Sequence, residues 1–499
     1  MNIIYINPPS LSSGLDAISK SIPLNLITLA AMLPEHDAKV LDCKVDKNFE
    51  EKIDAEIEWA DIVAITSLTP QIDSALYIAS KAKLLKKTTI IGGYHATLDP
   101  DYVINHPSVD FIVRGEGEHT FKEIVDFLTD NDEKISITEI DGLSFKDGAG
   151  NVKHNKPRMM ECDLDSLPLP RRDLLNRKDY VYMGAFQDGL ETSRGCPHDC
   201  TFCCITKMWR HPDQNIRYRT KSVARIIEEI ESIDKKVDYL FFKDDNFTIK
   251  PERTKEILEA ILKSEKARSF SYGCQSRVDT LYHNPWLIDL MKETKFRQVF
   301  LGIESVHQQS LDAMNKKNTT PAMTRQVVNA LHKKGISVFG GVIIGYPGET
   351  KEMVYQNIQF AKSLKMAMVQ FTPISAFPGT VFYDEMKEKG MITSDDYSNY
   401  DLFHVMMRTD QLSSEEIDQL VKEAYSYYYL DGEYIKLRAK QFLNPFGPYN
   451  WLLKRIHKVI KQFLFGGGKM LQGSGMSKSI ISEELKNTQI PEALINRNR

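Results

Sequence analysis

Residues 192–204 read TSRGCPHDCTFCC, and three of their thiols, Cys196, Cys200 and Cys203, lie on one short loop. Zinc prefers four protein ligands in a closed structural site, and no second cysteine pair follows downstream. Three thiolates suit a cubane iron–sulfur cluster that keeps one iron open for an external ligand. A loop of unligated thiols is the alternative. Cys204 is adjacent to a ligand, and we expect it to point away and pack.

The cysteine loop follows the first of six predicted strands that alternate with helical segments. These strands are expected at residues 190–192, 239–243, 270–274, 298–303, 338–344 and 368–372. Six such units fit an incomplete barrel as well as an open sheet. We therefore predict one strand–helix domain over residues 186–395, a helical region over 396–465 and a flexible tail over 466–499.

Residues 1–130 show the same alternation. Their β-branched runs, spaced by helical segments, predict a doubly wound parallel sheet of the Rossmann-like type. Ligands of such sheets bind at the carboxyl ends of the strands, and here those ends carry small, polar, glycine-rich loops. Tight turns are the alternative explanation for each glycine. Residues 131–185 are predicted to be a linker that contains a hairpin turn at residues 147–151.

Length and composition narrow the classes of protein further. The 499 residues should form two to four domains at ~100–200 residues each. The net charge of −4 offers no general attraction for a polyanion, so we expect no nucleic-acid partner. The seven cysteines are an odd number, and four lie within residues 196–204, which favours a metal site in a reducing, cytoplasmic compartment. We expect neither a signal peptide nor a membrane-spanning segment.

The cysteine loop after a strand resembles that of the radical S-adenosylmethionine enzymes. The preceding domain, with GGYHAT at residues 92–97 and GEGE at 115–118, resembles the cobalamin-binding domain fused to one branch of them. The resemblance implies a TIM-type partial barrel and three cofactors: a 4Fe–4S cluster held by Cys196, Cys200 and Cys203, S-adenosylmethionine, and cobalamin. Reductive cleavage of S-adenosylmethionine to a 5′-deoxyadenosyl radical further implies an external one-electron reductant of the ferredoxin or flavodoxin type.

The resemblance also assigns residues to S-adenosylmethionine. Carboxylates such as Asp244 suit the methionine ammonium, although Asp245 could equally cap the next helix. A guanidinium at Arg277 suits the methionine carboxylate. The full set of expected contacts is Phe202, Asp244, Asp245, Gln275, Arg277, Glu304, Gly341 and Gly345.

For cobalamin, the expected contacts lie on the loops of the first domain. They are Asn7, Ser67, Thr69, Gly92, Gly93, His95, Thr97, Gly115 and Glu116. The Asp-x-His-x-x-Gly motif of domains that ligate cobalt is absent. We therefore expect cobalt without a protein histidine, and His95 in contact with the corrin but not bound to the metal.

Residues 451–465 form a separate basic amphipathic pattern. Large apolar side chains recur at helical spacing, the other face carries lysines and an arginine, and acidic residues are absent. This pattern favours either a helix packed on the barrel or one bound at a membrane interface. The second alternative would place the protein peripherally at the inner face of the membrane.

We expect methyl transfer to an unactivated carbon of a small-molecule or lipid substrate, with the methyl passing from S-adenosylmethionine to cobalt and then to a substrate radical. An oxidative cyclase or carbon–carbon coupling enzyme is the alternative within the same family. A cobalamin sensor or an iron–sulfur electron carrier is the alternative from another class. The predicted S-adenosylmethionine site argues against both of these.

Overall fold

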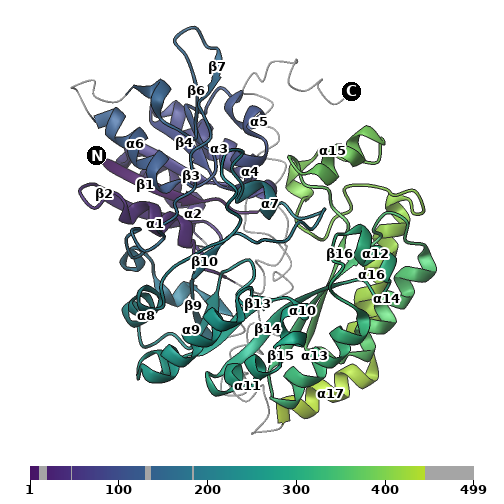
Figure 1. The fold of residues 1–499 in the computed structure, drawn as a ribbon. Coiled ribbons are helices and arrows are strands. Elements are labelled where there is room, and N and C mark those ends of the chain that lie inside the picture. Colours follow the sequence, from purple (N-terminus) through teal and green to yellow (C-terminus); the bar gives the residue numbers. More distant parts are fainter. Residues whose placement is uncertain (11–19, 47, 130–135, 183–184, 444–499) are drawn as a thin grey trace.

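The computed structural model describes residues 1–10, 20–46, 48–129, 136–182 and 185–443, which form two α/β units that lie against each other (Figure 1). The first unit is built on a seven-stranded sheet in the order β2-β1-β3-β4-β5-β6-β7. Its strands are β1 (Asn2–Asn7), β2 (Asp37–Asp42), β3 (Ile62–Thr66), β4 (Thr88–Gly92), β5 (Phe111–Val113), β6 (Leu143–Lys146) and β7 (Val152–His154).

Helices cover both faces of this sheet, as the doubly wound prediction requires. Alternate residues of β1 enter different cores: Ile4 packs in the core that contains α2 and α3, whereas Tyr5 packs in the core that contains α1 and α6. The helices of this unit are α1 (Leu24–Ala31), α2 (Phe49–Trp59), α3 (Ile72–Leu84), α4 (Tyr94–Leu98), α5 (Pro100–Ile104) and α6 (Glu118–Thr129). Strands β1 to β5 are parallel, so their carboxyl ends meet at one edge.

The first sheet continues beyond the predicted boundary at residue 130. Strand β6 pairs antiparallel with β5, and β7 pairs antiparallel with β6. The turn at residues 147–151 joins β6 and β7. Part of the expected linker is therefore an extension of the sheet. The two strands are short and partly exposed, and this explains why their pattern resembles a linker.

The second unit contains a seven-stranded sheet in the order β16-β15-β14-β13-β12-β9-β8 that curls into a partial barrel. Its strands are β8 (Val181–Tyr182), β9 (Ala185–Leu190), β12 (Tyr239–Phe242), β13 (Ser271–Ser276), β14 (Phe296–Glu304), β15 (Ser337–Ile344) and β16 (Met368–Pro373). The strands from β9 to β16 are parallel and match the six predicted ones, except that β9 ends at Leu190, where the predicted strand begins. A partial barrel is therefore formed, not an open sheet.

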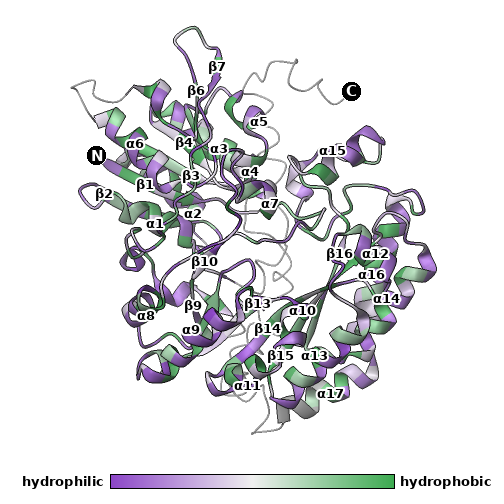
Figure 2. Cartoon of the chain, in the orientation of Figure 1, coloured by the Kyte–Doolittle hydropathy of each residue, from purple (hydrophilic) through white to green (hydrophobic). Residues whose placement is uncertain are grey.

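Helices cover the outer face of the barrel. They are α8 (Val223–Ser232), α9 (Pro251–Lys263), α10 (Val278–His283), α11 (Trp286–Glu293), α12 (Gln308–Ala313), α13 (Pro321–Lys333), α14 (Lys351–Ser363), α16 (Ser414–Tyr429) and α17 (Gly432–Leu443). Helix α15 (Val381–Glu388) instead packs at the carboxyl ends of β15 and β16. The strands between the helices and the barrel interior are largely apolar (Figure 2). A short ribbon of β10 (Ser193–Arg194) and β11 (Arg219–Thr220) and the short helix α7 (Ile205–Met208) flank the cysteine loop.

No helix in the described part of the chain is both long enough and apolar enough to cross a membrane. The basic amphipathic pattern at residues 451–465 and the predicted tail at 466–499 lie outside the described residues.

Candidate functional site

The cysteine loop leaves the barrel directly after β9 and is held in place at its start. Pairing of β10 with β11 sets Arg194 opposite Arg219. Gly195 follows with a φ of +87°, and a Cβ there would lie 2.4 Å from the Arg217 carbonyl oxygen, so only glycine fits this turn. Within the loop, the Cys203 amide donates to the Cys200 carbonyl at 3.1 Å.

Asp244 connects the end of β12 to the start of the cysteine loop. Its buried carboxylate accepts hydrogen bonds from the Thr192 amide at 3.2 Å and the Thr192 hydroxyl at 2.6 Å. The Ser193 hydroxyl donates to the same carboxylate. Asp244 therefore already has three donors and positions the loop, which differs from the expected contact with a ligand ammonium.

Charged groups surround the thiols. Arg277 Nη1 lies 3.9 Å from Cys200 Sγ, while Arg277 Nη2 donates to Asp279 at 2.8 Å. The ion pair with Asp279 holds the guanidinium beside the loop. Burial, with the nearby Glu191 and Asp244 carboxylates, raises the pKa of Asp245 to about 7. Asp245 is half-buried near the thiols, so it remains a candidate acceptor in the barrel.

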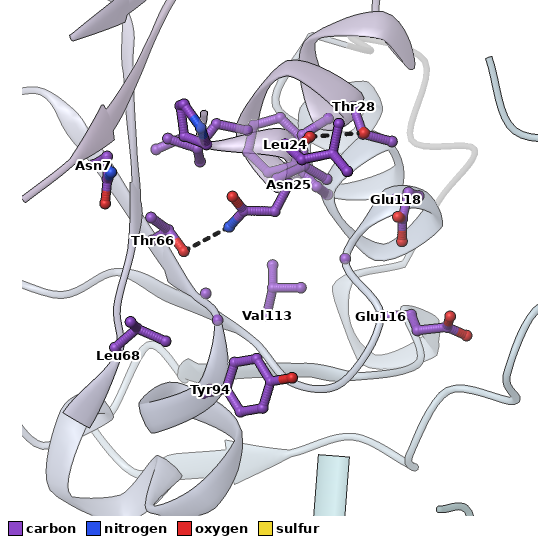
Figure 3. A pocket seen from close by; sticks show the side chains of 18 of the residues that line it. Asn7, Leu24, Asn25, Thr28, Thr66, Leu68, Tyr94, Val113, Glu116 and Glu118 are labelled. Carbon is purple, nitrogen blue, oxygen red and sulfur yellow. Dashed lines mark hydrogen bonds between the residues drawn. The ribbon is translucent and has the colours of Figure 1, made fainter. Parts of the chain in front are cut away.

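A cavity of about 430 Å³ lies where the carboxyl edge of the first sheet faces the second unit. Across it, the Asn25 amide donates to the Thr66 hydroxyl at 2.8 Å (Figure 3). Five of the residues expected to bind cobalamin line it: Asn7, Gly92, Gly93, Gly115 and Glu116. The second unit contributes Glu191, Arg194, Met208, Trp209 and Lys243.

Tyr94, the first residue of α4, connects this cavity to the cysteine loop. It lines the cavity, and its ring is labelled at the cavity wall in Figure 3. Burial raises its pKa well above the usual value, and the neighbouring groups that raise it further are Asp245, Cys203 and Cys204. Arg194 before the cysteine loop and Met208 after it also line the cavity, so the cavity borders the cysteine loop beside Tyr94.

A buried ion-pair network joins the two units beside the cavity. Arg194 Nη1 and Nη2 donate to Glu116 at 2.7 Å and to Glu118 at 2.6 Å, and Arg194 Nε donates to Glu191 at 2.8 Å. Arg219 Nη1 donates to the other oxygen of Glu116 at 2.7 Å. The Arg194 side chain is only 9% exposed, so this network is poorly screened by solvent.

Comparison with known proteins identifies the family. The model of the radical SAM superfamily matches residues 190–361, and that of the B12 binding domain matches residues 17–125. Uncharacterized methyltransferase PH0819 of Pyrococcus horikoshii is 33% identical over 440 residues, which cover 86% of this chain and 93% of that protein. The chain belongs to the cobalamin-binding radical S-adenosylmethionine family.

Other members of the family span most of the chain. The anaerobic magnesium-protoporphyrin IX monomethyl ester cyclase of Cereibacter sphaeroides is 25% identical over 443 residues, which cover 86% of this chain and 70% of that protein. Among solved structures, the cobalamin-dependent S-adenosylmethionine radical enzyme OxsB, with aqua-cobalamin and S-adenosylmethionine bound, superimposes with a TM-score of 0.66. Its identity is 18%, and the match covers 99% of this chain and 79% of that chain, which shows a shared fold.

As a radical S-adenosylmethionine enzyme of this family, the protein uses a 4Fe–4S cluster, S-adenosylmethionine and cobalamin. The donor set fits the cluster, because Cys196, Cys200 and Cys203 are three half-buried thiols on one loop. Within the described residues, no three His, Cys, Asp or Glu side chains converge closely enough to hold a single metal ion. A cubane binds each thiolate to a different iron, so its ligands stand farther apart than those of one zinc ion.

The cavity suits a corrinoid because part of its wall, at Gly92, Gly93, Gly115 and Gly117, consists of backbone without side chains. Gly115 has a φ of +76° and open space where a Cβ would stand, so any larger residue there would fill the cavity. Thr97 supports this wall from behind: its hydroxyl accepts from the Gly115 amide and donates to the Gly93 carbonyl, both at 2.9 Å. Glu116 lines the cavity, but its carboxylate is committed to Arg194 and Arg219.

His95 is not where it was expected. Its ring is buried, and its centroid lies 4.6 Å from that of Tyr397 and 5.8 Å from that of Tyr102. Burial lowers the pKa of His95 to about 3. We therefore correct the expected corrin contact: this imidazole packs between aromatic rings and is absent from the cavity wall. Ser67 and Thr69 are likewise buried behind the cavity, where the Ser67 amide donates to the Gly92 carbonyl at 2.9 Å.

The residues expected around S-adenosylmethionine lie at the carboxyl ends of the barrel strands. Glu304 ends β14 with a φ of +62° and receives a hydrogen bond from the buried Lys316 ammonium. Such a strained backbone costs ~1–3 kcal/mol and is concentrated at functional sites, which is consistent with the predicted contact of Glu304 with S-adenosylmethionine. Phe202 packs beside the ends of β15 and β16, and Gln275 is half-buried on β13.

Gly341 in β15 and Gly345 directly after it differ in what lies beside them. A Cβ on Gly345, where φ is +78°, would lie 3.0 Å from Ile417 of α16, so the turn requires glycine for a reason within the protein. The expected contact of Gly345 with S-adenosylmethionine stays a prediction. A Cβ on Gly341 would lie 3.1 Å from the Phe300 ring, and its contact with the ligand stays a prediction.

Sequence reasoning missed Arg194 and Lys243. Arg194 stands in the quoted cysteine stretch, but its partners Glu116 and Glu118 are 78 and 76 residues away, so no local pattern reveals them. Lys243 was detectable. It lies two residues after Phe241 and four after Tyr239, so strand alternation places all three on one face.

Proposed function

We propose that this protein transfers a methyl group to an unactivated carbon of a small-molecule substrate. The observation that carries the proposal is the common boundary of the cobalamin cavity and the cysteine loop at Tyr94. A cobalamin sensor or an iron–sulfur electron carrier has no need for both cofactors beside one cavity. The 33% identical relative is named a methyltransferase, which supports the same reaction.

The chain's own residues would position the cofactors and exclude water. When bound, the cofactors supply the methyl group, the one-electron cleavage of S-adenosylmethionine and a metal that carries methyl groups. Arg194 fixes the cysteine loop against the cobalamin loop through Glu116 and Glu118, and Asp244 fixes the same loop against β12. Fixed relative placement of reactants removes entropy from the barrier.

The test is the fate of an isotopically labelled methyl group. Reconstituted protein is incubated anaerobically with methyl-labelled S-adenosylmethionine, a low-potential reductant and a small-molecule extract of the source cells. Mass spectrometry should find a product heavier by one labelled methyl, together with 5′-deoxyadenosine. A product that has only lost hydrogen, with no label, would instead favour an oxidative cyclase. This reaction is the second candidate because one relative is named a cyclase.

The reductant and location are part of the same proposal. A ferredoxin or flavodoxin would supply the electron in the cytoplasm. The basic amphipathic pattern at residues 451–465 would hold the protein at an anionic membrane surface and favour a lipid substrate. Full-length protein should then co-sediment with anionic liposomes at low salt, and a chain truncated after Pro448 should not. Failure of the full-length protein to co-sediment contradicts the membrane proposal alone.

A further inference from the structure

Lys243 extends from the end of β12 into the barrel interior. On this strand Leu240 and Phe242 belong to the core under the outer helices, whereas Tyr239 and Phe241 lie on the opposite face. Lys243 shares that inner face, with Nζ 5.5 Å from the centre of the Phe241 ring. Lys243 therefore starts on the inner face of the barrel sheet and not in the core under the outer helices.

The neighbouring strand is shaped to let this side chain pass. A Cβ on Gly189 of β9 would lie 2.7 Å from Lys243 Cε and 3.2 Å from its Cγ. The Lys243 stem therefore crosses β9 over a residue that has no side chain. Its ammonium then donates a hydrogen bond to the Ser21 hydroxyl of the first unit. This path brings Lys243 to the boundary of the two units and into the wall of the cavity.

Burial and two charged neighbours act on the pKa of Lys243. Burial lowers the pKa of Lys243 to about 8, and Lys44 lowers it further. Asp188 is the carboxylate that opposes this shift, but it accepts from the Gly189 amide at 2.6 Å and from Arg172 Nε at 3.3 Å. The described hydrogen-bond partner of the Lys243 ammonium is thus a neutral hydroxyl. A buried ammonium is costly unless an anion reaches it.

The charges around the cavity are divided between two groups of residues. Glu116, Glu118 and Glu191 are all paired with arginines in the network described above. The other charged residues in the cavity wall are three lysines, Lys20, Lys44 and Lys243. The rest of the polar lining consists of neutral amides and hydroxyls such as Asn25, Thr28 and Thr66. A ligand that is neutral except for one anionic group would match this wall.

Cobalamin has this distribution of charge, because its periphery carries neutral amides and its nucleotide tail carries a single phosphodiester. We propose that Lys243 binds the phosphodiester of the cobalamin nucleotide tail. Amide groups of the corrin then meet the neutral part of the wall. Lysine is a frequent phosphate ligand because its ammonium is a compact charge with several donors. The proposal rests on the cofactor and not on the reaction that the protein performs.

The test compares two corrinoids that differ only in a phosphate group, cobinamide and cobinamide phosphate. Each is titrated into the full-length protein carrying its reconstituted cluster, and binding is followed by the corrin absorption. The unsubstituted protein should bind cobinamide phosphate about tenfold tighter than cobinamide, with a difference that shrinks as salt rises. Lys243→Met keeps the length of the side chain and should remove the difference.

Two further variants separate a lost contact from a lost fold. Gly189→Ala keeps the lysine but blocks the path of its stem, so it should displace the ammonium and also reduce the preference for the phosphorylated corrinoid. Lys422→Met removes an exposed lysine of α16 and should keep the full preference. Iron content and thermal unfolding confirm that each variant is folded.

An undiminished phosphate preference in both Lys243→Met and Gly189→Ala overturns the proposal. The same holds if Lys243→Met leaves that preference intact but raises the KM of the substrate, because the anion would then belong to the substrate. Equal affinity of the unsubstituted protein for the two corrinoids would also overturn it.

Discussion

The carboxyl edges of the two sheets differ in the groups that they present to a ligand. The first edge, with Gly92, Gly93 and Gly115, leaves open space and offers backbone groups. The second edge is rich in charged side chains, and several already have protein partners, as Asp244 has in Thr192 and Ser193, and Glu304 has in Lys316. Small residues therefore indicate directly where a ligand fits. A charged residue indicates a ligand only if no protein group has engaged it first.

The largest expected effect tests the donors of the second edge. Replacing Cys196, Cys200 or Cys203 with Ala should abolish cluster binding and 5′-deoxyadenosine formation, because each thiolate holds a different iron. Cys204→Ala is the matched control and should keep about four irons and full activity. Iron analysis and product chromatography on anaerobically reconstituted protein measure both. Loss of the cluster in Cys204→Ala with retention in Cys203→Ala would reverse the ligand assignment.

Removing a partner from the charged interface should cost the most stability. Arg194→Met leaves Glu116, Glu118 and Glu191 buried without their shared cation. Breaking a buried ion pair by removing one partner costs ~3–5 kcal/mol of unfolding free energy, measured by urea denaturation. The exposed pair of Lys422 and Asp418 on α16 is the control, and Lys422→Met should change the same quantity by less than ~0.5 kcal/mol. Equal effects of the two would mean that the interface network is not a structural link.

The glycine edge should respond mainly in ligand affinity. Gly115→Val places a branched side chain in the cavity, at a φ of +76° that costs ~1–2 kcal/mol for a residue other than glycine. Corrinoid affinity, measured by absorption titration, should fall by at least about tenfold. Gly148→Val, in the exposed turn between β6 and β7, has equal open space around it and should leave affinity unchanged. Undiminished affinity in Gly115→Val would show that this part of the cavity is not used.

The smallest effect on stability is expected for His95, whose ring packs against Tyr102 and Tyr397. Because burial lowers its pKa to about 3, the unfolded chain takes up a proton below pH 6.5 that the folded chain does not. Stability should therefore fall as pH decreases from 6.5, by up to ~1.4 kcal/mol per pH unit from this group. His95→Phe should reduce this dependence of stability on pH. The buried His106, whose pKa is lowered to about 4, should still contribute to it.

At pH 7 the His95→Phe variant should differ from the unsubstituted protein by less than ~1.5 kcal/mol, since the ring volume is nearly conserved. Corrinoid affinity should not change. A clear loss of affinity would restore His95 as a corrin contact and show that the aromatic site opens when the ligand binds.

How far the sequence predicts the molecule depends on the range of the interactions. β-branched runs such as residues 62–66 are local signals, and they placed the parallel strands of both sheets well. The hairpin turn at residues 147–151 was predicted, but the pairing of its strands with the first sheet was missed because β6 and β7 are short, antiparallel and half polar. The network around Arg194 was missed because pairing across 76 residues depends on the folded arrangement of two units. His95 was misplaced because its aromatic neighbour Tyr397 lies in a distant part of the sequence, so no local pattern pairs the two rings.

The two units contain separate hydrophobic cores, and they meet at the cavity and the Arg194 network. A corrinoid in that cavity contacts both units, so its binding free energy couples their unfolding equilibria. At a free concentration one hundred times its Kd, the corrinoid stabilises the state in which both units are folded and docked by ~2.7 kcal/mol. Unfolding of the corrinoid-free chain should then approach two transitions, and saturation with corrinoid should merge them into one.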